Sequence, residues 1–276
     1  MKKVDKIIHK WLKVPYRLNI HIVQRVKKPR ATLLFIHGIG NSTAAWDKVI
    51  NRMPADVSIV NVDLLGFGFS PRPTWAVYDA RRQARSVAAS YRRLRLRGPV
   101  IIVGHSLGAL VAVEMAKLYP RTIKSLVLCS PPFYTNQAVT KKLLPNNEKI
   151  LLGLYRAIQT HPEQFVKISA ISAKYGIINR AFQVTDENVH AYMGALEASI
   201  VNQTAYEDVQ KIPQSVAIIY GTLDPVVVAK NIKQLALTCP NITAKSTVAA
   251  HEIKGPYIAA IAKLIIRTID TDVRHT

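Results

Sequence analysis

Residues 103–108 read Val-Gly-His-Ser-Leu-Gly, with one serine between two glycines at the end of an apolar run. Residues 100–103 are all β-branched, as in a buried strand, and residues 107–119 place apolar side chains at helical spacing. Ser106 therefore lies in a turn between a strand and a helix. Gly104 and Gly108 suit that turn because a Cβ at either position would crowd the backbone. The alternative is an ordinary loop serine, but the flanking strand and helix favour a strand–turn–helix unit.

Further strands and helices alternate along the chain. We expect strands at residues 32–36, 57–62, 100–103, 125–129, 216–220 and 243–248, and helices at 43–53, 79–96, 107–119, 226–237 and 256–269. Residues 16–26 alternate in a way that predicts an antiparallel hairpin. Strands separated by helical stretches are typical of an α/β fold with a mostly parallel central sheet flanked by helices. Residues 133–210 contain no β-branched block, so we expect a helical insertion between two strands.

Composition limits the class of protein. The chain has 276 residues, of which 49% are hydrophobic, so it can bury a sizeable core and is not a disordered protein. Cys129 and Cys239 are too few for a disulfide framework, which favours a reducing compartment. Lys6 and Lys10 interrupt what would be the apolar region of a signal peptide, and no long apolar run predicts a membrane span. We expect a cytoplasmic protein, with a peripheral position at a membrane surface as the alternative.

Three side chains are candidates for catalysis. A serine hydroxyl needs a base within hydrogen-bond reach, and the base needs a partner that fixes its tautomer. Asp224 directly follows the strand at 216–220, and His251 follows the strand at 243–248. Reactive groups gather at the carboxyl ends of parallel strands, so we expect Ser106, Asp224 and His251 to meet there.

Several motifs in this order resemble the α/β-hydrolase-fold serine hydrolases, in the esterase- and lipase-like form with a helical cap. They are His-Gly-Ile-Gly at 37–40, Asp-Leu-Leu-Gly-Phe-Gly-Phe-Ser at 63–70, Gly-His-Ser-Leu-Gly at 104–108, Gly-Thr-Leu-Asp at 221–224 and Ala-His at 250–251. The resemblance covers roughly residues 16–270. It implies a core of 16–132 and 211–276, with the cap at 133–210. Helical spacing separately predicts an N-terminal amphipathic helix at 1–15.

The resemblance also implies a role for each site residue. Ser106 would be the nucleophile, His251 the general base and then acid, and Asp224 the group that orients the imidazole. The backbone N–H groups of Ile39 and Leu107 would form the oxyanion hole. Four glycines would shape the site: Gly38 and Gly40 in the first loop, and Gly104 and Gly108 around the serine.

The implied activity is hydrolysis of a small-molecule carboxylic ester with a small to medium acyl chain, through an acyl-enzyme and without a cofactor. Thioesters, lactones and carbon–carbon bonds are alternative targets of the same machinery, and a weakly catalytic ligand-binding or receptor-like protein is a further alternative. Some large side chains of the cap would line the acyl pocket, and more of them would form the cap's own core. The candidates are Tyr134, Tyr155, Phe165, Tyr175, Phe182, Tyr192 and Met193.

Other polar residues fit the chemistry less well. Glu252 adjoins His251, and neighbouring side chains diverge, so it is a poor partner for that ring. Asp63 ends a strand, but the resemblance implies that it shapes a loop. Some relatives carry the acid after the strand at 125–129, where this chain has Ser-Pro-Pro at 130–132. We expect His37 and His105 to be structural and the two cap histidines, His161 and His190, to lie at the surface; no motif predicts a metal site.

The chain is strongly basic, with 38 Lys and Arg against 17 Asp and Glu, a net charge of +21. This charge is either a functional surface for anionic partners or a general compositional bias. Within residues 2–13, an apolar stripe opposes a lysine stripe on a helix. Three interpretations of the apolar stripe are open: it packs on the protein itself, it binds an anionic membrane, or it contacts a partner protein. Seven arginines at 81–97 indicate a solvated helix packed by its apolar side, and no motif predicts specific nucleic-acid binding.

Overall fold

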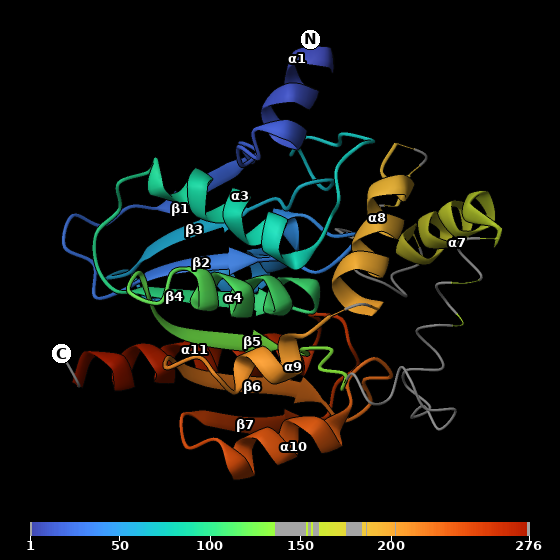
Figure 1. Cartoon of the computed structure of the whole chain (residues 1–276). Coiled ribbons are helices and arrows are strands. Elements are labelled where there is room, and N and C mark those ends of the chain that lie inside the picture. Colours follow the sequence, from blue (N-terminus) through green and yellow to red (C-terminus); the bar gives the residue numbers. More distant parts are fainter. Residues whose placement is uncertain are drawn as a thin grey trace.

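The structure is a computed structural model that describes residues 2–135, 153, 156, 160–174, 184–185, 187–201 and 203–274. Within these residues, a seven-stranded sheet has the order β1-β3-β2-β4-β5-β6-β7 (Figure 1). The strands are β1 (Ile20–Gln24), β2 (Thr32–Ile36), β3 (Ser58–Val62), β4 (Val100–His105), β5 (Ile123–Cys129), β6 (Ser215–Gly221) and β7 (Ile242–Thr247). Among these seven strands, only β1 pairs antiparallel, with β3, and the other pairs are parallel. The predicted α/β fold with a mostly parallel central sheet is confirmed.

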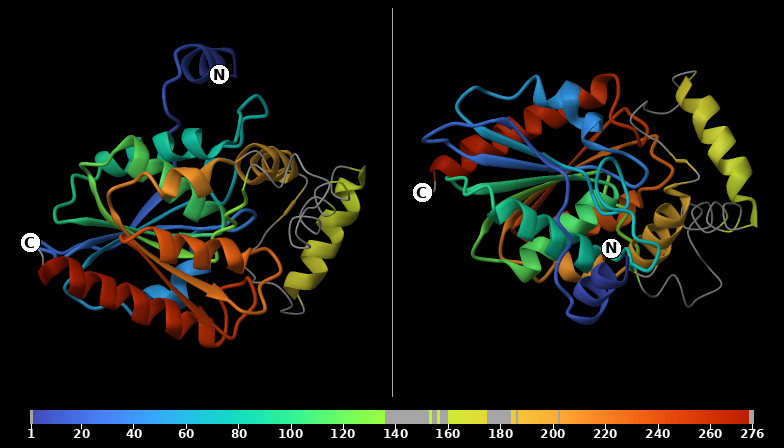
Figure 2. Two further views of the ribbon diagram at one scale, coloured as in Figure 1. Left: turned by 60° about the horizontal axis from the view of Figure 1, so that its bottom comes forward. Right: turned by 90° about the horizontal axis from the view of Figure 1, so that it is seen from above.

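Helices cover both faces of the sheet (Figure 2). The helices α3 (Ala80–Arg92), α4 (Leu107–Leu118) and α10 (Ala229–Thr238) bury side chains in one core. The short α2 (Asp47–Ile50), which follows a 3-10 turn at Thr43–Trp46, and the long α11 (Pro256–Arg274) form the other core. Along β2, Leu34 and Ile36 point into the first core and Leu33 and Phe35 into the second. Burial on both faces explains why these strands appear in the sequence as continuous apolar runs.

The predicted hairpin at residues 16–26 is wrong. The segment forms one strand, β1, which pairs with β3 rather than with its own neighbour. Before β1, the backbone N–H groups of Tyr16 and Leu18 donate to the hydroxyls of Ser86 and Ser90 on α3, at 3.2 and 2.9 Å. Because α3 satisfies these donors, the first half of the segment has no need of a partner strand.

The N-terminal segment is helical, with α1 (Lys2–Lys6) followed by a π-helical turn at Ile7–Trp11. Its apolar stripe does not pack on the protein, because Val4, Ile7, Trp11 and Leu12 are 59%, 53%, 73% and 67% exposed. The helix stands away from the sheet in Figure 1. No helix in the described parts of the chain has the length and the apolar character needed to cross a membrane.

The described residues of the insertion contain helices and no strand, as predicted. They are α7 (Pro162–Lys174), α8 (Val189–Ala195), a π-helical turn at Leu196–Val201 and α9 (Ala205–Val209). In Figure 1, α7 and α8 lie beyond the ends toward which the parallel strands point. Tyr155, Tyr175 and Phe182 lie outside the described residues. The boundaries of a cap at 133–210 stay a prediction.

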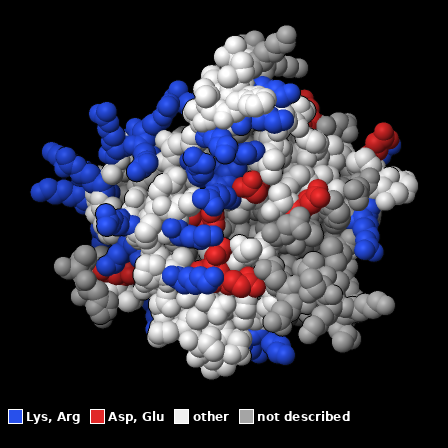
Figure 3. Space-filling view, viewed as in Figure 1, with Lys and Arg blue, Asp and Glu red and all other residues white. Residues whose placement is uncertain are grey.

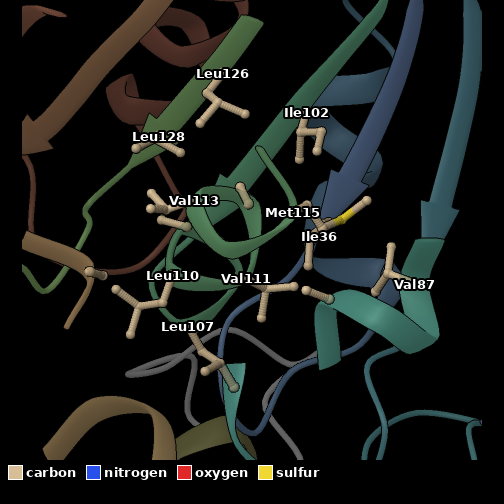
Figure 4. Packing of buried hydrophobic residues seen from close by; sticks show 14 of the residues in the cluster. Ile36, Val87, Ile102, Leu107, Leu110, Val111, Val113, Met115, Leu126 and Leu128 are labelled. Atoms are coloured by element: carbon tan, nitrogen blue, oxygen red, sulfur yellow. The ribbon is translucent and has the colours of Figure 1, made fainter. Parts of the chain in front are cut away.

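Helix α4 lies directly on the sheet (Figure 4). Its apolar side chains meet those of β2, β4 and β5 in the first core. A Cβ added to Gly108 would lie 2.2 Å from the carbonyl oxygen of Ile36 in β2, and one added to Gly104 would lie 2.4 Å from the Gly108 oxygen. Backbone therefore touches backbone where α4 begins, which explains why both positions are glycine.

Because Gly108 faces rigid backbone, Gly108→Ala should destabilise the fold by about 1–3 kcal/mol, the usual range for an overpacked core site. Urea unfolding monitored by circular dichroism measures this change. The matched control is Gly153→Ala, since Gly153 is exposed and no described atom lies within 4 Å of its added Cβ. Equal unfolding midpoints for the two variants would contradict the close approach of α4 to β2.

Candidate active site

Ser106 occupies a strained turn between β4 and α4. It is the residue before the first turn of α4, with φ 51° and ψ −117°, and its side chain lies in a 3%-exposed position. Non-glycine residues with positive φ in such regions cost about 1–3 kcal/mol and persist only where the surroundings enforce them. Here the Ser106 N–H donates to the Cys129 carbonyl of β5 at 3.0 Å, and the flanking glycines admit the tight approach. The predicted strand–turn–helix unit is present.

Asp224 and His251 form a hydrogen-bonded pair. The Nδ1–H of His251 donates to Asp224 Oδ2 at 2.8 Å. The other carboxylate oxygen accepts from the backbone N–H groups of Val226 and Val227, at 2.9 and 3.3 Å. A neutral imidazole that donates through Nδ1 keeps its lone pair on Nε2, the atom that a general base uses.

The loops that carry this pair are tightly packed. A Cβ added to Gly221, at the end of β6, would lie 2.1 Å from the carbonyl oxygen of Ala249. The Leu223 N–H donates to the same oxygen at 3.0 Å. These contacts fix the 222–225 turn against the segment before His251. Asp224 and His251, which are far apart in the sequence, therefore stay within hydrogen-bond distance.

The pair has opposite effects on the pKa values of its two members. Burial alone would lower the pKa of His251, but the hydrogen bond and charge of Asp224, with the charge of Glu252, outweigh burial and raise it above its ordinary value. Burial alone would raise the pKa of Asp224, but His251, the Val226 N–H and the Ser130 hydroxyl together lower it. The site therefore favours a carboxylate beside an imidazole that accepts a proton readily.

His105 joins the strand end that bears Ser106 to the loop that bears His251. Burial lowers the pKa of His105 to about 3, with a further contribution from the charge of His251, so its ring is neutral. His105 Nε2–H donates to the His251 carbonyl at 2.9 Å, and the two ring centroids are 5.0 Å apart. Ser106, adjacent to His105, thus lies at the same sheet edge as the Asp224–His251 pair. The ring of His105 serves a structural contact, as predicted.

The loop at residues 37–40 passes against the serine. A Cβ added to Gly38 would lie 2.9 Å from His105 Nδ1 and 3.2 Å from Ser106 Cβ. His37 fixes this loop, because its Nδ1–H donates to the Gly38 carbonyl at 2.7 Å and its Nε2 accepts from the Leu64 N–H at 3.0 Å. Burial lowers the pKa of His37, which keeps Nε2 available as an acceptor. Ile39 and Leu107, the predicted oxyanion donors, adjoin Gly38 and Ser106 in the sequence.

Asp63 organises the loop after β3. Its carboxylate is fully buried and accepts from the Thr43 N–H at 2.7 Å, the Asn19 side chain at 2.8 Å and the Phe69 N–H at 2.9 Å. The carboxylate carbon would lie 2.2 Å from a Cβ added to Gly68, which has φ +53°. These contacts match the loop-shaping role that the resemblance implies for Asp63.

Sequence reasoning missed the contribution of Ser130 and Tyr257. Ser130 directly follows β5, has φ 47° and is fully buried, with its hydroxyl 2.9 Å from that of Tyr257. The Tyr257 hydroxyl donates to the Ile219 carbonyl at 3.0 Å, one strand further along the sheet. In the sequence, the Ser-Pro-Pro stretch at 130–132 indicated only that no catalytic acid follows this strand. The position of Tyr257 on a terminal helix gave no signal, since its partners are distant in the sequence.

Some of the cap residues can be placed. The Tyr134 hydroxyl donates to the Val226 carbonyl at 2.7 Å, beside the Asp224 turn. The rings of Phe165 and Tyr192 pack at 5.4 Å, and Met193 is half-buried against the first core. His161 and His190 are exposed, as predicted.

Comparison with known proteins identifies the family to which this fold belongs. Residues 31–252 match the model of the alpha/beta hydrolase fold family. The chain belongs to the α/β-hydrolase family. An esterase from Exiguobacterium antarcticum has the same fold, with a TM-score of 0.75 at 15% identity over 92% of this chain and 95% of that chain.

Curated relatives of this α/β hydrolase align over part of their length. A probable lysophospholipase, BODYGUARD 2 of Arabidopsis thaliana, is 35% identical over 114 residues, which are 39% of this chain and 24% of the relative. The (lyso)-N-acylphosphatidylethanolamine lipase of Mus musculus is 29% identical over 131 residues, which are 46% of this chain and 38% of the relative. The chain therefore spans well under half of each of these relatives.

The electrostatics of the three site histidines predict distinct titrations. His251 should titrate above pH 6.5, while His105 and His37 should stay neutral through that range because burial lowers their pKa values. Asp224→Asn removes the charge that raises the pKa of His251, so the His251 titration should shift toward acid. Proton NMR of the histidine ring signals measures both effects. An unchanged His251 titration in Asp224→Asn would show that the pair does not form in solution.

Proposed function

We propose that this chain is a serine hydrolase that cleaves carboxylic esters with a small to medium acyl chain. The observation that carries the proposal is the 2.8 Å hydrogen bond between His251 Nδ1 and Asp224 Oδ2, at the sheet edge where Ser106 sits on its strained turn. A serine alone is a poor nucleophile at neutral pH. An imidazole with an oriented lone pair on Nε2 is the base that it requires.

The first step is attack of Ser106 Oγ on the carbonyl carbon of the ester, with its proton passing to His251 Nε2. The imidazolium that forms is stabilised by the Asp224 carboxylate, which keeps its charge because its pKa is lowered. His251 then gives the proton to the leaving alcohol. Water repeats the sequence on the acyl-enzyme and releases the acid, so no cofactor is consumed.

The developing oxyanion is held by the backbone N–H groups of Leu107 and Ile39. Leu107 is the first residue of α4, where N–H groups have no partner within the helix. Ile39 follows Gly38, whose backbone lies against Ser106. Two donors fixed by the fold need no reorganisation as the charge develops, and one such donor contributes about 3 kcal/mol to the transition state.

The choice of an ester rests on the nucleophile and on the relatives. Serine supports acyl transfer, and the similar proteins include a probable lysophospholipase, a lipase and an esterase. Residues 133–210 would form a helical cap over the sheet edge. Tyr134 and Tyr192 are buried there and contribute apolar surface near the site. Thioesters and lactones are the alternative substrates for the same residues.

Ser106→Ala should lower the turnover of chromogenic esters by at least about 10³-fold, because only the nucleophile is removed. A panel of p-nitrophenyl esters of rising chain length measures turnover and locates the preferred acyl group. Ser215→Ala is the matched control, since Ser215 is exposed at the opposite end of β6 and should leave turnover unchanged. Turnover that survives Ser106→Ala, or a fluorophosphonate label on another serine, would refute the proposed nucleophile.

The pH dependence should follow His251. A general base works when neutral, so kcat/KM should fall about tenfold per pH unit below its pKa, with the acidic limb above pH 6.5 because Asp224 raises that pKa. In Asp224→Asn, the limb should move to lower pH while the plateau rate falls by about 10³-fold or more. Measurement of kcat/KM between about pH 4 and 9, for the wild type and for Asp224→Asn, gives both the position of the acidic limb and the plateau rate. A limb that stays in place would assign the titration to another group.

A further inference from the structure

The N-terminal segment presents apolar side chains to solvent. Val4, Ile7, Trp11 and Leu12 are each more than half exposed, and Val14 is 44% exposed. Soluble proteins seldom gather large exposed apolar side chains on one short segment unless it meets a partner or a lipid surface. We call residues 4–14, together with Arg17, Arg81, Arg82 and Arg85, the N-terminal face.

The segment is held to the protein by its other side. The ring of His9 stacks on that of Tyr16, with centroids 3.9 Å apart and planes inclined by 19°, and its Nδ1 is hydrogen-bonded to the Val14 carbonyl at 2.8 Å. Asp5 and His9 line a cleft of about 430 Å³ with Tyr16, Arg17 and the loop at residues 71–75. The side of the helix that carries Asp5 and His9 is thus directed toward the protein, while most of the apolar stripe and the lysines face solvent, unlike a helix that packs its apolar side on its own core.

Positive charge surrounds this apolar stripe. Lys6, Lys10, Lys13 and Arg17 are exposed along the segment. The first two turns of α3 add Arg81, Arg82 and Arg85, which line a second cleft with His9 and Lys13. Figure 3 shows Lys and Arg side chains gathered over α3 and toward the N-terminal helix. Asp5 and Asp79 are the acidic residues that line these two clefts.

The charges and apolar groups of the N-terminal face together indicate which kind of partner it can bind. A second copy of the chain would bring two basic faces together, each on a molecule of net charge +21, and like charges oppose that contact. A nucleic acid would engage the lysines and arginines but would leave the aliphatic stripe in water. An anionic bilayer accepts both, since lipid phosphates attract the cations and the headgroup boundary takes up tryptophan and aliphatic side chains.

We propose that the N-terminal face binds the surface of anionic phospholipid bilayers, with Ile7, Trp11 and Leu12 at the headgroup–acyl boundary and the surrounding lysines and arginines against the phosphates. This binding requires no catalytic residue. It also brings lipid close to the insertion, because the loop at 71–75 contacts α8 and the residues just before it: the His190 ring lies 2.8 Å from the Thr74 carbonyl oxygen, and Arg72 lies 3.7 Å from Glu187.

Co-sedimentation of the full chain with vesicles tests the proposal. Vesicles of about 30% phosphatidylglycerol in phosphatidylcholine should bind the protein, and pure phosphatidylcholine vesicles should bind it at least tenfold more weakly. Ile7→Glu with Trp11→Glu should reduce binding to the anionic vesicles at least tenfold. The control carries the same kind of change at Leu237→Glu, since Leu237 is 83% exposed on α10, and it should bind nearly as the wild type does.

Three further measurements separate lipid binding from misfolding, dimerisation and nucleic-acid binding. Thermal melts of the variants should coincide with that of the wild type, because the substituted side chains are exposed. Tryptophan emission should shift to the blue with anionic vesicles, and this change should be lost in Trp11→Phe, which keeps the buried Trp46 and the half-buried Trp75. Equal vesicle binding by the double variant and the wild type would overturn the proposal. So would a stable dimer that dissociates only in the double variant, or retention on DNA that competes with vesicles and depends on Trp11.

Discussion

The reversal of the chain at Ser106 is the constraint from which the site follows. The strand β4 must stop, turn and continue as α4 within a few residues, and α4 must still lie close enough to β2 to bury its apolar side chains. That is possible only with glycine at 104 and 108, where an added Cβ would lie 2.2 to 2.4 Å from backbone oxygens. The energy stored in the positive φ of Ser106 is offset by the burial of α4, whose residues 107–116 are all buried. Strain at one residue is thus maintained by the packing of a whole helix.

The same turn determines how the neighbouring histidines behave. His105 precedes the reversal and points into the fold, where burial keeps it neutral and its N–H binds the His251 carbonyl. His37 is also neutral and buried, and it ties the Gly38 loop to the segment that begins at Leu64. Of these three rings, the one hydrogen-bonded to a carboxylate is that of His251, whose side chain is 19% exposed. Two neutral rings therefore hold the backbone in place, while the third ring has the electrostatics that suit proton transfer.

Local patterns in the sequence were sufficient for most of the core. Glycines around Ser106, Asp224 directly after a strand and His251 before a helix are short-range signals, and the family motifs supply their order. The failures involve contacts between distant residues. Ser86 and Ser90 supply partners for the backbone before β1, and a period-two pattern contains no information about a helix roughly seventy residues away. For the same reason, the Ser130–Tyr257 contact across the sheet and the outward orientation of the Trp11 stripe were not predictable from periodicity.

The positive charge of the surface is increased by the way in which the few acidic residues are used. Several of them serve hydrogen bonds within the protein: Asp63 holds a loop, Asp79 caps α3 through the Arg82 N–H, and Asp272 accepts from Ser125. Few acids are left to neutralise the lysines and arginines on the surface, which repel one another through solvent. This repulsion contributes nothing to the packing of either core, so the fold does not explain the net charge of +21. An excess of cations of this kind acts at a distance instead: it raises the local concentration of anionic surfaces near the protein, and salt weakens the effect.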